Sequence, residues 1–407
     1  MQDKKTYKTT SNRVAVTGMG IISAIGNSVE DNKAALFSYK SGIKPISKIL
    51  TIHASQIQVG EVSSSNNTLL TQLQLTPDTN FTRTALLGLT AVKEALNNAK
   101  IIEFDTYKTG LISSTTVGGM DKTEQHLKQY KTSLKSQKYI SSHHAGDSTQ
   151  KIANYIGIND FTTTISTACS SAANAIMLGA RLIKSGKLDR VIVGGTDALS
   201  KFTINGFKTL MILSDQLCQP FDDNRKGLNL GEGAAYLVLE SEFIAKKEKQ
   251  SILAYVSGYA NANDAFHQTA SSENGQGAYL AMQKALRIAK IKPEQIDYIN
   301  AHGTATPNND LSESVAIKRV FGDQIPNLSS TKANTGHTLA ASGAIEAVFS
   351  VLALQEQTVF PNLNFKSKMK ETMLTPITKI KKTEIKHVLS NSFGFGGNCS
   401  TIIFSKK

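Results

Sequence analysis

Short apolar runs rich in Val and Ile alternate along the chain with longer stretches in which apolar residues recur at helical spacing. This alternation predicts an α/β protein. Val-rich runs that precede a glycine occur at 13–18 and again at 253–258, and glycine-containing strand patterns occur at 189–198 and 387–398. We interpret these repeated patterns as an internal duplication. One half then spans residues 1–250 and the other spans residues 251–407.

The length of 407 residues exceeds the usual span of one hydrophobic core. With 40% hydrophobic and 19% charged residues, the composition is that of a globular protein. We expect no membrane span, because no uninterrupted apolar run reaches the required length. Residues 1–12 are polar and contain no apolar signal core, so we expect a cytoplasmic location. Three widely separated cysteines indicate reduced thiols rather than a disulfide framework.

The formal net charge of +13 raises the question of nucleic-acid binding. We expect none, because the lysines are scattered and the basic stretches lack interleaved aromatic residues or a binding motif. The densest basic segment, 366–386, holds seven Lys against Glu371 and Glu384. It fits either a solvated surface or a surface for an acidic or phosphorylated partner, whose encounter with the chain would be accelerated by long-range attraction.

Gly18 and Gly20 follow a strand pattern and are similar to the start of a dinucleotide-binding fingerprint. The third glycine of that fingerprint is replaced by Ser23, and no clear acidic residue ends a second strand about 20 residues later. We therefore predict a tight strand-to-helix turn at these glycines and no nucleotide site.

Cys169 lies where a β-rich segment gives way to small residues and then to an apolar stretch with helical spacing. This pattern places the thiol at the start of a helix. Unpaired backbone N–H groups and the positive end of the helix dipole favour thiolate, which is the reactive form. The sequence therefore predicts a covalent nucleophile whose thiol ionises readily.

Two histidines have surroundings typical of a site that would serve such a nucleophile. His302 directly follows a predicted strand and precedes the helix that contains Glu313. His337 stands between a polar turn and a small-residue helix. The adjacent pair His143 and His144 has no accompanying Cys or carboxylate cluster, so we predict exposed loop residues and no metal site there.

Four ordered segments together closely resemble the β-ketoacyl-acyl carrier protein synthases, which are condensing enzymes of the thiolase superfamily. They are 167–171 (TACSS), 300–310 (NAHGTATPNND), 329–337 (SSTKANTGH) and 391–397 (NSFGFGG). Supporting matches run from about residue 13 to 405. Because a histidine stands at 337, where the initiating type has Asn, the chain resembles the elongating Cys-His-His type.

The resemblance implies a thiolase-like fold of five layers, α-β-α-β-α, built from two similar halves. Cys169 would lie in the N-terminal half and both catalytic histidines in the C-terminal half. It also implies an acyltransferase that needs no cofactor of its own, because its substrates arrive on the phosphopantetheine of acyl carrier protein. Cys169 would accept the acyl group. His302 and His337 would stabilise the enolate formed when a malonyl unit loses its carboxylate.

The resemblance assigns further roles by position. Lys332 matches the active-site lysine, and Phe395 matches a gating residue whose backbone N–H joins that of Cys169 in an oxyanion hole. Three carboxylates are assigned supporting roles: Glu346 as the partner of Lys332, and Asp310 and Glu313 at the helix that follows His302. His267 resembles a gating-loop position, and the pocket segments 115–120 and 265–269 differ modestly from those of common fatty acid enzymes.

Two departures from the family pattern leave alternatives open. The family usually reads Thr-Asn after the glycine turn, but this chain has Asn398 and Cys399. A second thiol near the site would suit a thiolase-like base, although Cys399 also fits a small packing residue, as does Cys218 near a structural turn.

The expected assembly also has alternatives. It is a homodimer as in the family, or a heterodimer with a subunit that resembles a chain-length factor. A non-catalytic partner role is disfavoured by the retained Cys169, His302 and His337. Primary fatty acid elongation and a specialised polyene or polyketide pathway both fit the sequence.

Overall fold

The computed structural model describes residues 13–77 and 79–407, so the polar segment 1–12, on which the expectation of no export signal rests, lies outside the described residues. Within the described part of the chain the principal sheet has ten strands in the order β10-β9-β13-β14-β8-β1-β7-β6-β4-β5. Strands β1 and β8 join its two halves through only two residue pairs. The N-terminal strands are β1 (Val14–Ile22), β4 (Thr109–Ser114), β5 (Phe161–Ile165), β6 (Arg190–Asp197) and β7 (Gly233–Ser241). The C-terminal strands are β8 (Ala254–Asn263), β9 (Tyr298–Asn300), β10 (Asn327–Ser329), β13 (His387–Gly394) and β14 (Asn398–Ser405).

Both halves of the sheet have the same topology. Numbered within its own half, each runs third, second, fourth, fifth and first strand from the outer edge to the centre. The first strand is antiparallel to the fifth, the fifth is antiparallel to the fourth, and the remaining pairs are parallel. The predicted two similar halves are therefore confirmed. We retain the boundary near residue 250 as a proposal, because it falls between α9 (Glu242–Lys247) and β8.

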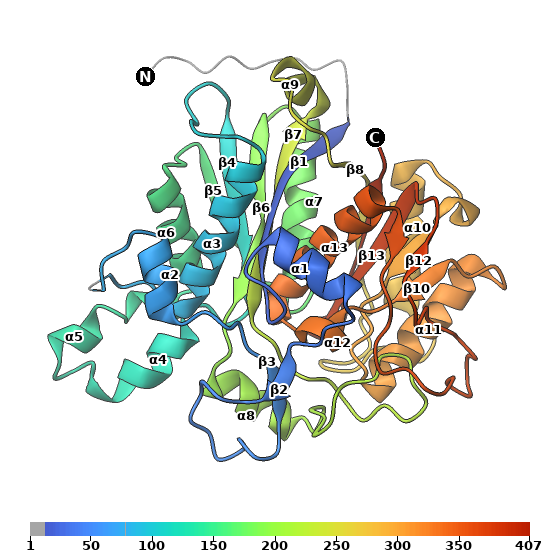
Figure 1. Ribbon diagram of the computed structural model, residues 1–407, viewed down its shortest axis with the longest axis horizontal. Coiled ribbons are helices and arrows are strands. Elements are labelled where there is room, and N and C mark those ends of the chain that lie inside the picture. The colour runs from blue at the N-terminus through green and yellow to red at the C-terminus, as the bar shows by residue number, and fades with distance from the viewer. Residues whose placement is uncertain (1–12, 78) are drawn as a thin grey trace.

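The helices form three layers around the two halves of the sheet (Figure 1). In the central layer, α7 (Ser171–Lys184) and α13 (Ser342–Glu356) contact each other and strands of both halves. The outer layers are α3 (Arg83–Asn98) with α6 (Gly146–Ile156) on the N-terminal half, and α10 (Gln276–Ala289) with α11 (Pro307–Phe321) on the C-terminal half. This is the predicted α-β-α-β-α order, and the thiolase-like fold class is confirmed.

The remaining elements are short or lie at the periphery. The helices are α1 (Val29–Phe37), α2 (Asn66–Gln72), α4 (Met120–His126), α5 (Leu134–Gln137), α8 (Lys201–Thr209) and α12 (Lys332–Thr335). The strands are β2 (Ile43–Pro45) with β3 (Gln58–Gly60), and β11 (Thr358–Val359) with β12 (Lys381–Lys382). A short 3-10 turn, η4 (Leu339–Ala341), precedes α13.

The largest hydrophobic cluster lies between the two halves and around the central helices. Helix α13 explains why: every residue from Ser342 to Leu354 is buried, so this stretch has no face exposed to solvent. The stretch Leu339–Glu356 is long and apolar enough to cross a membrane by length and composition alone, but 89% of it is buried inside the protein. Burial between the two halves of the sheet accounts for its apolar composition.

The prediction of a strand-to-helix turn at Gly18 and Gly20 is wrong. Both glycines lie within β1, where the backbone of α3 packs directly on the strand. A Cβ on Gly18 would lie 2.4 Å from the Ala95 carbonyl oxygen, and a Cβ on Gly20 would lie 2.1 Å from that of Ala91. These glycines permit close helix-on-sheet packing rather than a turn.

Candidate active site

One cavity of about 310 Å³ collects four of the nine predicted site residues. It is lined by Cys169, His302, His337 and Phe395, which come from segments far apart in the sequence. Apolar side chains from α8 and the chain after it form one wall, and polar residues at the start of α11 form another. The cavity therefore has an apolar wall and a polar wall, with Cys169 and Cys399 both bordering it.

Cys169 lies in a strained turn between β5 and α7. The preceding residue, Ala168, has a left-handed φ of 51°, which is unfavourable for a residue with a Cβ. Ser170 and Ser171 fix the turn by side-chain hydrogen bonds, since the Ser170 hydroxyl donates to the Thr167 carbonyl at 2.7 Å and the Thr167 N–H donates to the Ser171 hydroxyl at 2.8 Å. The nucleophile is thereby held one residue before the N-cap of α7.

The glycine turn after β13 closes over this cysteine. A Cβ on Gly394 would lie 2.8 Å from the Thr167 carbonyl oxygen and 3.2 Å from the Cys169 nitrogen, so only glycine permits the approach. The backbone N–H groups of Phe395 and Cys169 both interact with the Cys169 thiol and act to lower its pKa. Two N–H donors thus converge where an oxyanion on an acyl-cysteine would form.

The expectation that the helix start leaves Cys169 readily ionised is wrong for the resting site. Burial raises the pKa of the thiol to about 12, and the opposing effects of Lys332 and of the two backbone N–H groups are smaller. Cys169 is only 5% exposed, so the desolvation that disfavours a thiolate outweighs its local stabilisation. The resting nucleophile is a thiol.

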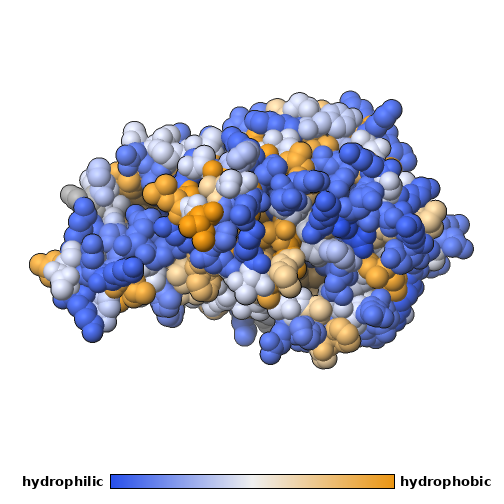
Figure 2. Space-filling model, turned by 90° about the horizontal axis from the view of Figure 1, so that it is seen from below, coloured by the Kyte–Doolittle hydropathy of each residue, from blue (hydrophilic) through white to orange (hydrophobic). Residues whose placement is uncertain are grey.

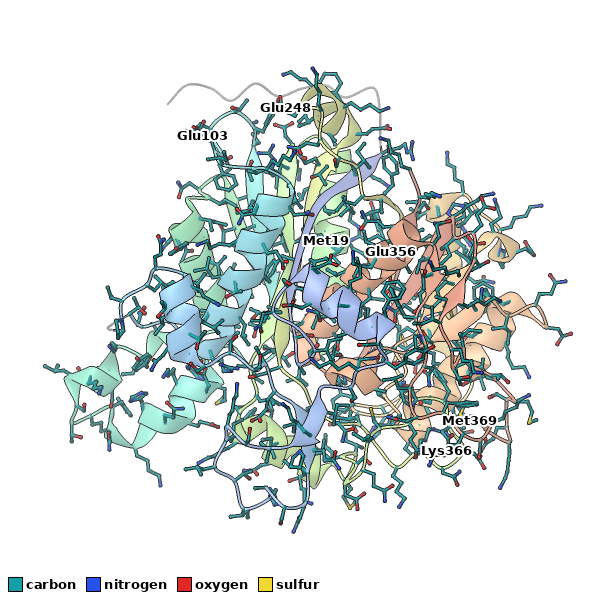
Figure 3. All side chains as sticks on the ribbon, viewed as in Figure 1. Met19, Glu103, Glu248, Glu356, Lys366 and Met369 are labelled. Atoms are coloured by element: carbon teal, nitrogen blue, oxygen red, sulfur yellow. The ribbon has the colours of Figure 1, made fainter. Side chains whose placement is uncertain are left out.

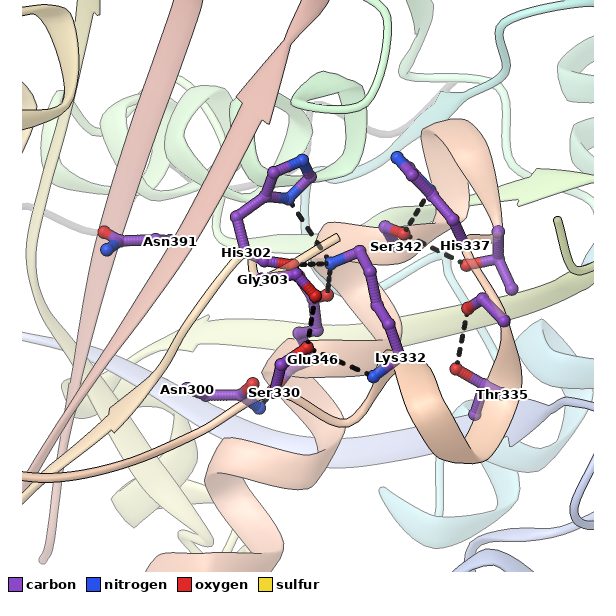
Figure 4. Close-up of polar contacts among 12 residues, drawn as sticks. Asn300, His302, Gly303, Ser330, Lys332, Thr335, His337, Ser342, Glu346 and Asn391 are labelled. Carbon is purple, nitrogen blue, oxygen red and sulfur yellow. Dashed lines mark hydrogen bonds and ion pairs between the residues drawn. The ribbon is translucent and has the colours of Figure 1, made fainter. Parts of the chain in front are cut away.

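Lys332 links His302 to Glu346 (Figure 4). Its ammonium group donates to the His302 carbonyl at 2.5 Å, lies 3.3 Å from His302 Nδ1 and forms a buried ion pair with Glu346. The contact predicted between Lys332 and Glu346 is therefore present. Because an ammonium has no acceptor, Nδ1 of His302 must accept, and the proton of the neutral ring lies on Nε2.

His337 is held in the same tautomer by different partners. Its Nδ1 accepts from the Leu339 N–H at 3.1 Å and lies 3.1 Å from the Ser342 hydroxyl, which leaves the ring proton on Nε2. The two imidazole rings stand nearly perpendicular, with centroids 5.5 Å apart. In Figure 4 their unengaged nitrogens project to the same side.

Both rings are neutral. Burial, reinforced by the nearby Lys332 charge, lowers the pKa of His302 and that of His337 well below the usual histidine range. Each ring can therefore donate an N–H bond into the cavity without carrying a charge, as neutral electrophilic histidines do.

Phe395 lies at the apolar wall of the cavity, where its ring stacks on Phe207 of α8 with centroids 5.8 Å apart. Gly396 and Gly397 follow it with left-handed φ angles of 79°. A ring on such a turn can change position between the cavity and the wall. The geometry suits the predicted gate.

Asp310 and Glu313, on the helix that follows His302, accept hydrogen bonds from the loop that carries it. Glu313 accepts from the N–H groups of His302 at 2.9 Å and Gly303 at 2.8 Å. Asp310 accepts from the Phe221 N–H at 2.7 Å and the Ala305 N–H at 3.1 Å. Burial raises the pKa of both carboxyls, to about 7 for Glu313. Asp310 also lies in the first turn of α11, so the two carboxylates support both the loop and the helix that follows it.

Other predicted residues lie outside the cavity or do not suit a chemical role. His267 is exposed and does not line the cavity, although Thr269 of the same loop does. The segment 115–120 also lies away from the cavity, and Thr115 donates to the buried Asp197 instead.

The other two cysteines stay protonated, so neither is a thiolate that could act as a base. Cys399 does line the cavity, but burial raises the pKa of its thiol far above the usual range. Cys218 is buried, and its pKa is raised to about 12. Among the described residues no group of three or more His, Cys, Asp or Glu could hold a metal ion.

The structure adds residues that the sequence did not single out. Phe207 packs on the gate, Phe393 lies against His302 with ring centroids 5.7 Å apart, and Ser342 orients His337. Ser342 could have been found as a polar position in the small-residue helix five residues after His337. No local pattern marks Phe207, because its contact is formed only by the fold.

Two family models together match most of the chain. The model for "Beta-ketoacyl synthase, N-terminal domain" matches residues 11–243, and that for "Beta-ketoacyl synthase, C-terminal domain" matches residues 253–366. A "3-oxoacyl-[acyl-carrier-protein] synthase 2" from Coxiella burnetii is 34% identical over 408 residues, which cover 97% of this chain and 98% of the relative.

Solved structures agree with this likeness. "The ishigamide ketosynthase/chain length factor" superimposes with a TM-score of 0.91 at 29% identity, over 98% of this chain and 100% of the other. The ketosynthase complex "AntDE:AntF (apo): type II PKS acyl-carrier protein in complex with its ketosynthase bound to the hexaketide" gives a TM-score of 0.88 at 27% identity, over 98% and 100% of the two chains.

Proposed function

The chain belongs to the β-ketoacyl synthase family, and we propose that it joins an acyl group held on Cys169 to a malonyl unit delivered by acyl carrier protein. The product is a β-ketoacyl thioester on the carrier, and carbon dioxide is released. The observation that carries the proposal is the single cavity in which Cys169, two neutral histidines and two backbone N–H donors meet. The carriers supply their own phosphopantetheine, so the chain needs no cofactor.

In the first half-reaction, the Cys169 sulfur attacks the acyl thioester of a carrier. The N–H groups of Cys169 and Phe395 stabilise the oxyanion of the tetrahedral intermediate. The carrier sulfur leaves with the electron pair of its carbon–sulfur bond. The proton of the Cys169 thiol ends on that sulfur, so the exchange of one thiol for another has no net proton requirement. The buried resting thiol is therefore compatible with acylation.

In the second half-reaction, a malonyl thioester loses its carboxylate, and the electrons of the broken carbon–carbon bond form an enolate. The Nε2–H groups of His302 and His337 donate to the thioester oxygen on which this charge develops. The enolate carbon then attacks the acyl carbon on Cys169 and expels the cysteine sulfur as a thiolate, which takes up one proton from water to restore the resting thiol. Lys332 and Glu346 are positioning residues in this scheme, because they fix His302 without reaching the reacting atoms.

Direct measurement of the acyl-enzyme tests this proposal. The purified chain is incubated with acyl carriers of several lengths, then with malonyl carrier, and both protein and products are measured by mass spectrometry. We expect an acyl adduct on Cys169 and its disappearance as product forms. His302→Ala and His337→Ala should each slow decarboxylation by roughly 100-fold or more while the adduct still forms. Absence of the adduct on Cys169 would overturn the proposal.

A second candidate is that the chain is the active half of a heterodimer with a subunit like a chain-length factor. The similarity to the ishigamide ketosynthase/chain length factor structure favours it. The complete Cys169, His302 and His337 set supports a catalytic rather than a scaffold role in either assembly. Product formation by the chain alone would support the homodimer, whereas adduct formation without elongation would support the heterodimer.

The proposed location is cytoplasmic. All three cysteines are buried free thiols, which suits a reducing compartment. The carrier is the proposed soluble partner in that compartment.

A further inference from the structure

Asp197 is a carboxylate at the end of β6 that the proposed mechanism does not use. The surface at the α8 end of the molecule is largely hydrophilic (Figure 2), but Asp197 is 0% exposed. Because the carboxylate is shielded from solvent, groups of the protein must stabilise it. The role of Asp197 therefore follows from the groups that donate to it.

These donors come from both halves of the chain. From the loop after β4, the Thr115 hydroxyl and the Thr116 N–H donate to the carboxylate, the N–H at 3.1 Å. From the second half, the Ala340 N–H of η4 donates to it at 2.9 Å. Asp197 therefore holds the turn that follows His337 against the first half of the chain.

The same turn fixes the His337 ring. Leu339, directly before Ala340, has a left-handed φ of 52°. This conformation is unfavourable for a residue with a Cβ and persists only where its neighbours hold it. The Leu339 N–H donates to Nδ1 of His337 at 3.1 Å. Two successive N–H groups thus have different acceptors, and the contact with the carboxylate stabilises the backbone conformation that the contact with the ring requires.

We propose that Asp197 is a positioning residue for His337. By holding Ala340, it keeps the Leu339 N–H on Nδ1 of the ring and the ring proton on Nε2. Without the carboxylate, the Ala340 N–H loses its buried acceptor, and the strained turn relaxes. The remaining partner of Nδ1, the Ser342 hydroxyl at 3.1 Å, can donate or accept, so it does not select a tautomer by itself. The inference rests on the proposed function, in which Nε2–H of His337 donates to the enolate oxygen.

A substitution that keeps the shape of Asp197 tests the proposal. In Asp197→Asn, one carboxylate oxygen becomes an amide nitrogen, which cannot accept a hydrogen bond. We expect the acyl adduct on Cys169 to form at an undiminished rate, whereas decarboxylation of malonyl carrier should slow roughly tenfold or more. In a His337→Ala chain, Asp197→Asn should cause no further loss of decarboxylation, because the ring that it positions is absent.

Asp189 provides a matched control at the opposite end of β6. It is 4% exposed, and its carboxylate accepts from the Lys108 N–H at 3.1 Å. The neighbouring Tyr107 hydroxyl donates to Glu248, which Figure 3 shows at the end of the molecule opposite to α8. Asp189→Asn therefore perturbs a comparable backbone contact away from the site and should leave both half-reactions unchanged.

Nitrogen NMR of the chain with isotope-labelled histidine gives a readout that does not depend on turnover. The spectrum of His337→Ala identifies the ring. We expect an unprotonated Nδ1 and a protonated Nε2 in the unmodified chain, and we expect Asp197→Asn to move the two signals toward each other as the tautomers mix. Where Asp197→Asn does not fold, the smaller Asp197→Ser replaces it, with the same expected results.

The other outcomes overturn the positioning role. They are an unchanged decarboxylation rate or unchanged ring signals in Asp197→Asn, an equal loss in Asp189→Asn, and a further loss when Asp197→Asn is added to His337→Ala. If the unmodified chain formed no Cys169 adduct and decarboxylated no malonyl carrier, the proposed function itself would fail. The ring signals of His337 would then still decide whether Asp197 holds the ring in one tautomer.

Discussion

The sulfur of Cys169 is subject to two opposing effects within a few ångströms. Two N–H groups and the Lys332 charge favour the thiolate, and burial favours the thiol by a larger amount. A site arranged in this way stabilises negative charge mainly when it appears on a substrate oxygen. Preorganised donors are most effective at such developing charge, because they need no reorganisation during the reaction.

This balance predicts how Cys169 responds to pH. A thiol with a pKa of about 12 gains thiolate tenfold for each pH unit, so alkylation by iodoacetamide should rise about 100-fold between pH 7 and pH 9. An ordinary cysteine would level off near pH 8.5. Site-resolved mass spectrometry measures the rate, and Cys169→Ser gives the background from Cys218 and Cys399. A plateau at or below pH 8.5 would show that the local donors outweigh burial.

At the level of single residues, the sequence predicted which residues form the site better than it predicted the burial and ionisation of those residues. Cys169, His302 and His337 stand in distinctive motifs, and the structure brings all three to one cavity. The degree of ionisation of Cys169 could not be predicted, because desolvation depends on distant segments that cover the sulfur. The sequence also did not predict a role for Phe207, because only the folded chain places this residue against Phe395.

At the level of elements, the site depends on the contact between the glycine turn after β13 and the strained turn before α7. Gly394→Ala should push the glycine turn away from the turn that carries Cys169, because the new Cβ would lie too close to the Cys169 nitrogen and the Thr167 carbonyl. Displacing an oxyanion donor by a fraction of an ångström to an ångström should reduce kcat/KM by about 100-fold. Steady-state kinetics with acyl and malonyl carriers measures the loss.

A matched glycine separates this effect from a general loss of stability. Gly206 lies in helix α8, and a Cβ there would meet nothing within 4 Å. Gly206→Ala should therefore raise the free energy of unfolding by roughly 0.5–1 kcal/mol and leave kcat/KM unchanged. Wild-type activity in Gly394→Ala would contradict the proposed contact between the two turns.

The same reasoning explains why Gly18 and Gly20 were misinterpreted. A glycine permits either an unusual φ angle or a close neighbour, and a single sequence does not distinguish the two. Here the neighbour is the backbone of α3, which lies more than 70 residues further along the chain. Short-range patterns predicted the strands, whereas the packing of a helix on a strand depends on the three-dimensional arrangement.

At the level of the whole molecule, the duplication places the site where the two halves meet. Cys169 comes from the start of α7 in the first half, and the histidines precede α11 and α13 in the second. The Val-rich and glycine-containing patterns that recur in the sequence indicate that the two halves have a similar strand order. The sequence could not predict that β1 and β8 join both halves into one sheet, because this contact consists of only two backbone residue pairs.

The two edges of that sheet differ, and the difference predicts a partner subunit at the β5 edge. At the β10 edge, the Ile377 N–H donates to the Leu328 carbonyl at 2.8 Å, so another segment covers the strand. At the β5 edge, no backbone hydrogen bond joins the outer side to another described segment, and all five side chains are half-buried. Such an uncovered edge readily pairs with another strand. We therefore expect a twofold-symmetric dimer across β5.

Like charges introduced at a twofold interface repel, because each change occurs on both copies. Thr162→Lys adds a charge on β5, and we expect it to weaken the dimer so that the mass measured by light scattering falls toward that of one chain. Asn97→Lys, at the exposed end of α3, adds the same charge away from this edge and should leave the mass unchanged. A dimer of undiminished stability in Thr162→Lys would place the interface elsewhere. Dissociation of both variants would instead show that net charge, rather than the β5 edge, controls the assembly.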